Sequence, residues 1–194
     1  MTKYLLFFFL IFLNISIQAS NKDEIIKNIK KTENFSFNFK QTINNKTESG
    51  NCIIQYPKKI YCEYNNIKKK IIVSNGISLI INNRNSGTFY SYPLNKTPLI
   101  FLLDKDYLIK KITISKTRII ENKYISFRIL ENNNEINIFF DNKTFNLIGW
   151  QTLDVYQNLS ITFISSIKVN EKINDSLFLL PKKDWYFILL LFLF

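Results

Sequence analysis

Apolar and polar residues alternate along most of this chain, which is the pattern of β-strands with one buried face. The alternation is clearest between Gly50 and Gly76. The apolar face of this stretch carries Cys52, Ile54 and Tyr56 and then, after a turn at Pro57-Lys58, Ile60, Cys62 and Tyr64. Polar residues, Gln55 and Glu63, fall on the other face. We predict a hairpin whose apolar face lines a hydrophobic space.

Similar alternation predicts that this hairpin belongs to a long antiparallel sheet. Asn75-Gly76 indicates another tight turn, because both residue types accept a positive φ at little cost. Clusters of Asn, Asp and Lys bound the remaining strand segments at the spacing typical of antiparallel sheets. These segments are residues 35–41, 70–74, 79–81, 87–92, 109–115, 124–130, 135–140, 145–153 and 159–164.

Two segments have helical patterns instead. Residues 22–31 place Ile25, Ile26 and Ile29 at helical spacing, with acidic residues in the first turn, where they favour a helix. Residues 97–103 begin with a Thr that can cap a helix and a Pro suited to a first helical position. The predicted fold is therefore α+β and mainly β: a curled antiparallel sheet whose concave side is capped by short apolar helices.

The composition fits one domain with a large apolar interior. The chain has 194 residues, 46% of them hydrophobic, including 18 Phe and 10 Tyr. The formal net charge is +11, but the lysines are scattered, which favours a solvated surface over a dedicated anion site. We expect no nucleic-acid partner. Histidine is absent, which removes a Ser-His-Asp triad, and two cysteines alone cannot close a zinc site. We therefore expect no enzyme activity and no metal or other cofactor.

Both ends of the chain are strongly apolar. Residues 1–19 have the features of a signal peptide: Lys3, an apolar run over 4–13, and small residues before a cleavage site after Ala19. The run is shorter than the length of about 20 residues that a transmembrane helix needs. We therefore expect an exported protein whose domain spans residues 20–184. Residues 185–194 form a second short apolar run. This tail could pack into the protein's own cavity, anchor at a membrane interface, or result from a truncated reading frame.

Export makes a disulfide between Cys52 and Cys62 permissible. The two positions are symmetric about Pro57, so they face each other if the hairpin loop has an odd number of residues. Such a bond would fix the register of the two strands. The alternative is a pair of small buried side chains, because free cysteine is readily buried.

Several short motifs occur in a fixed order along the chain. They are Phe35 and Phe39-Lys40-Gln41, Gly50 with Tyr56-Pro57, residues 71–76, Thr97-Pro98-Leu99 with Leu102-Leu103, Asp154 with Gln157, and Phe178 with Pro181. Over residues 23–181 the chain resembles the periplasmic outer-membrane lipoprotein carrier family, LolA. The resemblance implies an incomplete β-barrel, closed by helices, around a cavity that takes the acyl chains of lipoproteins. It also implies a monomer that receives lipoproteins from an inner-membrane ABC-type exporter and delivers them to an outer-membrane acceptor.

The resemblance also suggests which residues contact the cargo. The expected acyl-chain contacts are Phe37, Phe39, Ile54, Tyr56, Tyr64, Ile72, Leu79, Ile81, Phe127, Ile129, Ile138, Phe140, Ile161 and Phe163, and the expected lid residues are Leu99, Leu102 and Leu103. The alternative for each is an ordinary core position that touches no ligand. Family members often carry an Arg directly before the hairpin Pro, where it bonds the lid-helix backbone; Tyr56 stands there in this chain. Its hydroxyl can make one such bond, but not the several bonds of a guanidinium.

Three functional hypotheses follow. The first is a periplasmic carrier of acylated proteins. The second is a sensor on a similar fold that detects lipids or lipoproteins and binds a membrane signalling protein. The third, an enzyme acting on lipids, is remote, because the chain has no His and no nucleophile elbow.

Overall fold

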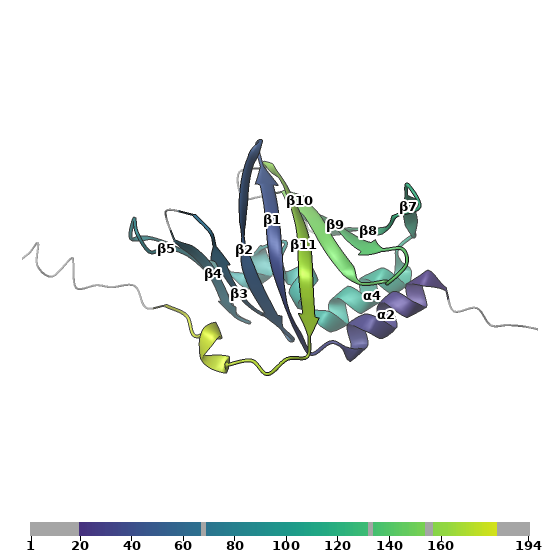
Figure 1. The fold of residues 1–194 in the computed structure, drawn as a ribbon, viewed down its shortest axis with the longest axis horizontal. Coiled ribbons are helices and arrows are strands. Elements are labelled where there is room, and N and C mark those ends of the chain that lie inside the picture. Colours follow the sequence, from purple (N-terminus) through teal and green to yellow (C-terminus); the bar gives the residue numbers. More distant parts are fainter. Residues whose placement is uncertain (1–19, 67–68, 132–133, 154–156, 182–194) are drawn as a thin grey trace, which may run out of the picture.

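The computed structural model describes residues 20–66, 69–131, 134–153 and 157–181 (Figure 1). The predicted signal peptide and the apolar tail at 185–194 lie outside these residues, as does Asp154. In the described chain, eleven antiparallel strands form one sheet in the order β6-β5-β4-β3-β2-β1-β11-β10-β9-β8-β7. The strands are β1 Asn34–Ile43, β2 Lys46–Gln55, β3 Lys59–Tyr64, β4 Lys70–Asn75, β5 Ser78–Asn83, β6 Thr88–Pro93, β7 Arg118–Ile120, β8 Tyr124–Glu131, β9 Asn134–Asp141, β10 Leu147–Leu153 and β11 Leu159–Val169.

The sheet curls without closing. In the described residues, strands β6 and β7 stand at its two ends and do not pair with each other. Among the described residues, three short α-helices accompany the sheet: α2 Asn21–Lys31, α3 Ile100–Leu103 and α4 Lys105–Ile114, together with the 3-10 turns η2 Leu94–Lys96 and η3 Asp175–Phe178. The predicted fold class, a curled sheet forming an incomplete barrel with short helices, is confirmed.

Helix α2 forms where the sequence predicts it. Ser20 precedes its first turn and exchanges hydrogen bonds with Asp23, so the free N–H groups at this end are partly satisfied. Ile25 and Ile29, four residues apart, are buried on one face. Figure 1 shows α2 beside α4 on the β8–β11 side of the concave face. Lys22 Nζ donates to the carbonyl oxygen of Ser115 at 2.8 Å and so helps to join the two helices.

The prediction of a strand at residues 109–115 is wrong. Residues 105–114 form helix α4, and the carboxylate of Asp104 accepts a hydrogen bond from the Tyr107 N–H at its start. Leu108 and Ile112, again four residues apart, are buried. The β-branched run Ile112-Thr113-Ile114 favours a strand locally. Burial of the helical face against α2 and the sheet overrides this preference.

The core lies between the concave face and the helices. Strand β1 contributes Phe35, Phe37 and Phe39, all nearly fully buried. The Phe37 ring meets the edge of Trp150 from β10 at a centroid distance of 6.2 Å. Residues from α2, α3 and α4 belong to the same cluster. The concave face therefore carries the main core, with the helices packed directly against part of it, and a smaller group on the other face (Ile71, Val73, Ile80 and Phe178) is also buried.

The central hairpin has the geometry that a disulfide requires. Strands β2 and β3 are joined by three residues, 56–58, so Cys52 and Cys62 stand directly opposite each other. Their Cα atoms are 4.1 Å apart and the two side chains form a disulfide. The turn at Asn75-Gly76 is also present, with Gly76 at a φ of 99° between β4 and β5.

Glycine is required at position 50 because neighbouring groups approach its Cα closely. It pairs with Phe39 on one side and Tyr64 on the other, and these two rings meet edge to face at 4.7 Å above it. A Cβ at this position would clash with the carbonyl oxygen of Glu63 and lie 2.8 Å from a ring carbon of Phe39. The absence of a side chain at Gly50 thus lets the aromatic pair sit on the sheet.

Gly50→Ala should lower the free energy of unfolding by about 3 kcal/mol, the upper end of the range for overpacking a core. Urea titration followed by circular dichroism measures this change. Ser49→Ala, a matched change at the exposed neighbouring position, should stay within about 0.5 kcal/mol of the parent protein. Equal stability of the two variants would contradict the packing described for Gly50.

The double variant Cys52→Ala/Cys62→Ala should lose about 2–3 kcal/mol of stability, the amount expected from cross-linking a loop of this length in the unfolded chain. The loop spans a sequence separation of 10. Denaturant titrations of the variant, and of the parent protein under reducing conditions, should give the same midpoint, below that of the parent protein with its disulfide intact. Unchanged midpoints in both would show that the disulfide does not constrain the chain.

Candidate functional site

The strand register places a set of side chains from two parts of the sheet around one cavity. On β1, Phe39, Gln41 and Ile43 face the concave side; β10 and β11 contribute on one flank and β2–β6 on the other. The cavity has a volume of about 360 Å³. Its lining residues are Phe39, Gln41, Ile43, Cys52, Ile60, Cys62, Tyr64, Lys70, Ile72, Leu79, Ile81, Tyr92, Thr97, Pro98, Leu99, Trp150, Thr152, Leu153, Ser160 and Thr162. We call it the large cavity.

The large cavity is mainly apolar, and the disulfide forms part of its wall. Cys52 and Cys62 expose only 5% and 4% of their surface, and Ile72, the next residue across the sheet, faces the cavity beside them. Twelve of the lining residues are apolar, and the polar ones are Gln41, Tyr64, Lys70, Tyr92, Thr97, Thr152, Ser160 and Thr162. An apolar pocket with a few convergent polar groups is the usual form of a small-molecule or lipid site.

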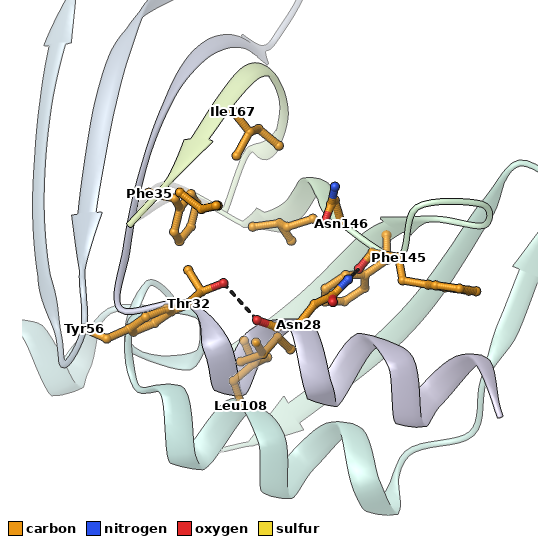
Figure 2. Close-up of a pocket in the computed structure, with 12 residues that line it drawn as sticks. Asn28, Thr32, Phe35, Tyr56, Leu108, Phe145, Asn146 and Ile167 are labelled. Atoms are coloured by element: carbon orange, nitrogen blue, oxygen red, sulfur yellow. Dashed lines mark hydrogen bonds between the residues drawn. The ribbon is translucent and has the colours of Figure 1, made fainter. Parts of the chain in front are cut away.

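A second hollow lies between α2 and the β9–β11 region. This small cavity has a volume of about 180 Å³. Figure 2 shows Phe35, Tyr56 and Ile167 on one side of it and Asn28 and Leu108 below. Asn28 and Thr32 are tied to each other, because the Thr32 hydroxyl donates to the Asn28 carbonyl oxygen at 2.9 Å.

The segment before α4 covers part of the large cavity. Thr97, Pro98 and Leu99 line the cavity, whereas Leu102 and Leu103 are fully buried in the core beneath. Of the three residues predicted to act as a lid, Leu99 thus lines the cavity and the other two hold the segment down. We call residues 97–103 the lid segment.

The tip of the central hairpin contacts the end of the lid segment. The Lys58 N–H donates to the Leu103 carbonyl oxygen at 2.8 Å. Lys58 Nζ lies 3.1 Å from a carboxylate oxygen of Asp104. Because Asp104 also caps α4, one carboxylate joins the hairpin to the start of that helix. The contact to the lid backbone thus comes from the residue after Pro57.

Tyr56 does not make the hydrogen bond to the lid-segment backbone that we considered for it. Its ring packs near Phe35 at a centroid distance of 6.2 Å, and Lys105 Nζ lies 5.5 Å from the ring centroid. Burial raises the pKa of the Tyr56 hydroxyl. Within the described chain this hydroxyl makes no hydrogen bond, so the bond to the lid backbone suggested for it is not present.

The predicted acyl-chain contacts fall into four groups. Phe39, Tyr64, Ile72, Leu79 and Ile81 line the large cavity. Tyr56 and Phe140 line the small cavity. Phe37, Ile54, Phe127, Ile129 and Ile138 are buried core residues of the concave side that line neither cavity. Ile161 and Phe163 lie on the opposite, convex face.

The position of Ile161 and Phe163 differs from the prediction because of strand register. Strand β11 pairs with β1 so that Thr162 stands opposite Gln41 and Ser160 opposite Ile43. Since successive side chains alternate between faces, Ile161 and Phe163 point outward, and Phe163 is 52% exposed. In the first half of this strand the apolar residues Ile161 and Phe163 lie on the outer face, and the polar residues Ser160 and Thr162 line the cavity.

Other lining residues escaped the sequence analysis. Ile60 shares a face with Cys62 and Tyr64, so the alternation of residues along β3 was sufficient to predict that it lines the cavity. The contributions of Trp150, Ser160 and Thr162 depend on which strand pairs with β1, and local pattern does not reveal that pairing.

Among the described residues, no group of three or more His, Cys, Asp or Glu side chains is placed to hold a metal ion. The described residues also contain no helix that is long and apolar enough to cross a membrane.

Comparisons with known proteins agree with this architecture. No curated protein sequence matches the chain. An uncharacterized conserved protein from Thermus thermophilus has a similar fold, with a TM-score of 0.50, 8% identity, and coverage of 84% of this chain and 93% of that one. A LolA superfamily protein from Nitrosomonas europaea gives a TM-score of 0.45 and 7% identity, covering 82% and 96%. The MucA/MucB complex of Pseudomonas aeruginosa gives 0.47 and 9%, covering 84% and 62%.

The family model of the outer membrane lipoprotein carrier protein LolA matches residues 30–181. The match includes every strand of the sheet and the lid segment. LolA family proteins are periplasmic and bind lipids and lipoproteins. Since the match covers well over half of the sequence, this chain belongs to the LolA family.

Proposed function

We propose that this protein is a periplasmic carrier that shelters the acyl chains of lipoproteins and moves them from the inner to the outer membrane. The observation that carries the proposal is the large cavity, which the protein's own side chains leave unfilled between the curled sheet and the lid segment. Its position on the apolar face of a LolA-family domain supports a ligand with long hydrocarbon chains.

The energetics of transfer explain why such a carrier uses apolar area. Each methylene group that leaves water gains about 0.8 kcal/mol, so a few acyl chains are nearly insoluble without shelter. A carrier must also release its cargo. Contacts with Phe39, Ile72 and Leu79 provide affinity in proportion to area, without a strong polar anchor that would hold the ligand back.

The lid segment supplies the means of opening. The volume of about 360 Å³ is near the lower end of the range of about 300–1,000 Å³ for ligand pockets. Several chains therefore require the lid segment to move away and exchange its own apolar contacts for those of the ligand. The Lys58–Asp104 pair that holds its end is partly exposed, and such pairs contribute about 1 kcal/mol or less.

The proposed partners follow from this role. An inner-membrane ABC-type exporter would supply the acylated protein and an outer-membrane acceptor would receive it, with this protein acting as a monomer between them. Cleavage of residues 1–19 as a signal peptide would place it in the periplasm. No enzymatic step is required, because transfer changes the surroundings of the acyl chains and not their bonds.

Binding of a fluorescent fatty acid tests the cavity directly. Ile72→Glu places a carboxylate on the cavity wall, where burial of a charge is costly, and should weaken binding at least tenfold. Ile77→Glu is the matched control, because Ile77 is 77% exposed in the β4–β5 turn. It should bind like the parent protein. Equal affinities in all three proteins, with native circular dichroism spectra, would refute binding in the large cavity.

Co-purification separates a carrier from a sensor. Affinity-tagged protein from the periplasm of its own host should carry lipoproteins of several sequences, identified by mass spectrometry. Cargo should be absent from the Ile72→Glu variant and present with Ile77→Glu. Recovery of one membrane signalling protein in place of lipoproteins would favour the sensor and contradict the carrier.

Asp104→Asn should speed release of bound fatty acid about two- to fivefold, because it removes the ion pair with Lys58 and keeps an acceptor for the helix cap. Stopped-flow displacement of the fluorescent fatty acid measures the rate. Glu24→Gln is the control, since it breaks another exposed ion pair of the same 3.1 Å length, with Lys27, on helix α2. Release that is equally fast in both variants would show that the hairpin contact does not restrain the lid segment.

A further inference from the structure

Four polar side chains form a continuous hydrogen-bonded band inside the large cavity. Gln41 Nε2 donates to the Ser160 hydroxyl at 3.1 Å and to the Thr162 hydroxyl at 3.3 Å. The Tyr64 hydroxyl donates to Gln41 Oε1 at 3.0 Å. These residues come from β1, β3 and β11, and all four line the cavity. We call Gln41, Tyr64, Ser160 and Thr162 the polar belt.

An ion pair closes one end of the polar belt. Lys70 Nζ lies 3.7 Å from the Tyr64 ring centroid and pairs with the carboxylate of Glu48. Asn66 Nδ2 donates to the same carboxylate at 2.9 Å. Burial, with the nearby Glu48 charge, raises the pKa of the Tyr64 hydroxyl, which therefore remains a donor. Lys70 is the cationic side chain among the residues found to line the cavity, and Glu48 already neutralises it.

The Ser160 and Thr162 hydroxyl groups do not use their hydrogens as donors within the polar belt. Ser160 and Thr162 are each 3% exposed, and each hydroxyl accepts a hydrogen bond from Gln41. In the part of the chain that the structure describes, neither hydroxyl hydrogen has an acceptor. A ligand that expels water from the cavity must itself offer an acceptor to these two hydroxyls, because a buried hydroxyl without an acceptor costs free energy. Gln41 itself uses both of its amide hydrogens within the belt.

The belt gives one part of the cavity wall a polar surface. Phe39 precedes Gln41 on the same face of β1, and the apolar wall of Cys52, Ile72 and Ile81 lies on that side. The belt lies nearer the turn that joins β1 to β2. A ligand whose hydrocarbon tail lies along this apolar wall can thus place a short polar head at the belt.

From this arrangement we infer that the polar belt is a subsite for the neutral carbonyl oxygen, of an ester or an amide, at the head of an acyl chain. The Ser160 and Thr162 hydroxyls donate to that oxygen while the tail lies against the apolar wall. A free carboxylate is disfavoured, because Lys70 is already paired and Glu48 would repel a second negative charge. The inference rests on the proposed function and adds a head-group preference to it.

Displacement of diphenylhexatriene, a fluorescent apolar probe without a head group, tests the subsite. Monopalmitoylglycerol should displace the probe about tenfold more effectively than palmitate at neutral pH. Thr162→Val should weaken the ester about fivefold relative to its effect on the probe, the effect of one lost hydrogen bond. Ser160→Ala provides a second variant at the same subsite. Thr42→Val is the control: it makes the same change at a half-exposed position of β1, where the hydroxyl bonds Thr47.

The outcomes separate this inference from the proposed function. If the probe binds but ester and carboxylate compete equally, and both variants match the control, the subsite is refuted and the apolar cavity stands. If neither the probe nor either lipid binds, both are refuted. An N-palmitoylated peptide added as a third competitor identifies the source of the carbonyl: competition by the peptide as strong as that of the glycerol ester supports an acylated protein, and competition by the ester alone indicates a glycerolipid.

Discussion

The double pairing of strand β1 is the constraint on which the structure depends. It pairs with β2 along one edge and with β11 along the other, and so joins the first six strands to the last five in one sheet. The register of these pairings decides which residues face the helices. A shift of one residue would exchange the cavity wall for the convex face. The Cys52–Cys62 bond and the close approach at Gly50 act on the β2–β3 hairpin next to β1 and fix its register.

Local pattern was sufficient for much of this fold. Strand alternation, the Asn75-Gly76 turn and the helical spacing of Ile25 and Ile29 each follow from neighbouring residues, and the structure confirms them. Local pattern was insufficient where contacts between residues far apart in the sequence determine the structure. Helix α4 exists because Leu108 and Ile112 bury against distant elements, although its last residues favour a strand. The face of β11 is set by its pairing with β1, which placed Phe163 outside and Thr162 inside.

The same pairing explains why the cavity is not uniformly apolar. The walls that come from β2–β5 carry Cys52, Ile72 and Ile81, whereas the wall from β11 carries Ser160 and Thr162. Affinity and release make opposite demands on a carrier. Apolar area gives the first, and a partly exposed contact at the end of the lid segment, together with neutral hydrogen bonds inside the cavity, permits the second.

The central claim is that acyl chains enter the concave cavity, and methyl NMR of isotope-labelled isoleucine tests it most directly. On titration with a palmitoylated peptide, the account predicts large shifts for the methyl groups of Ile60, Ile72 and Ile81, which line the cavity. It predicts no shift for Ile53 and Ile80, which lie on the other face of β2 and β5. Shifts confined to convex-face isoleucines, with the cavity residues unchanged, would contradict it.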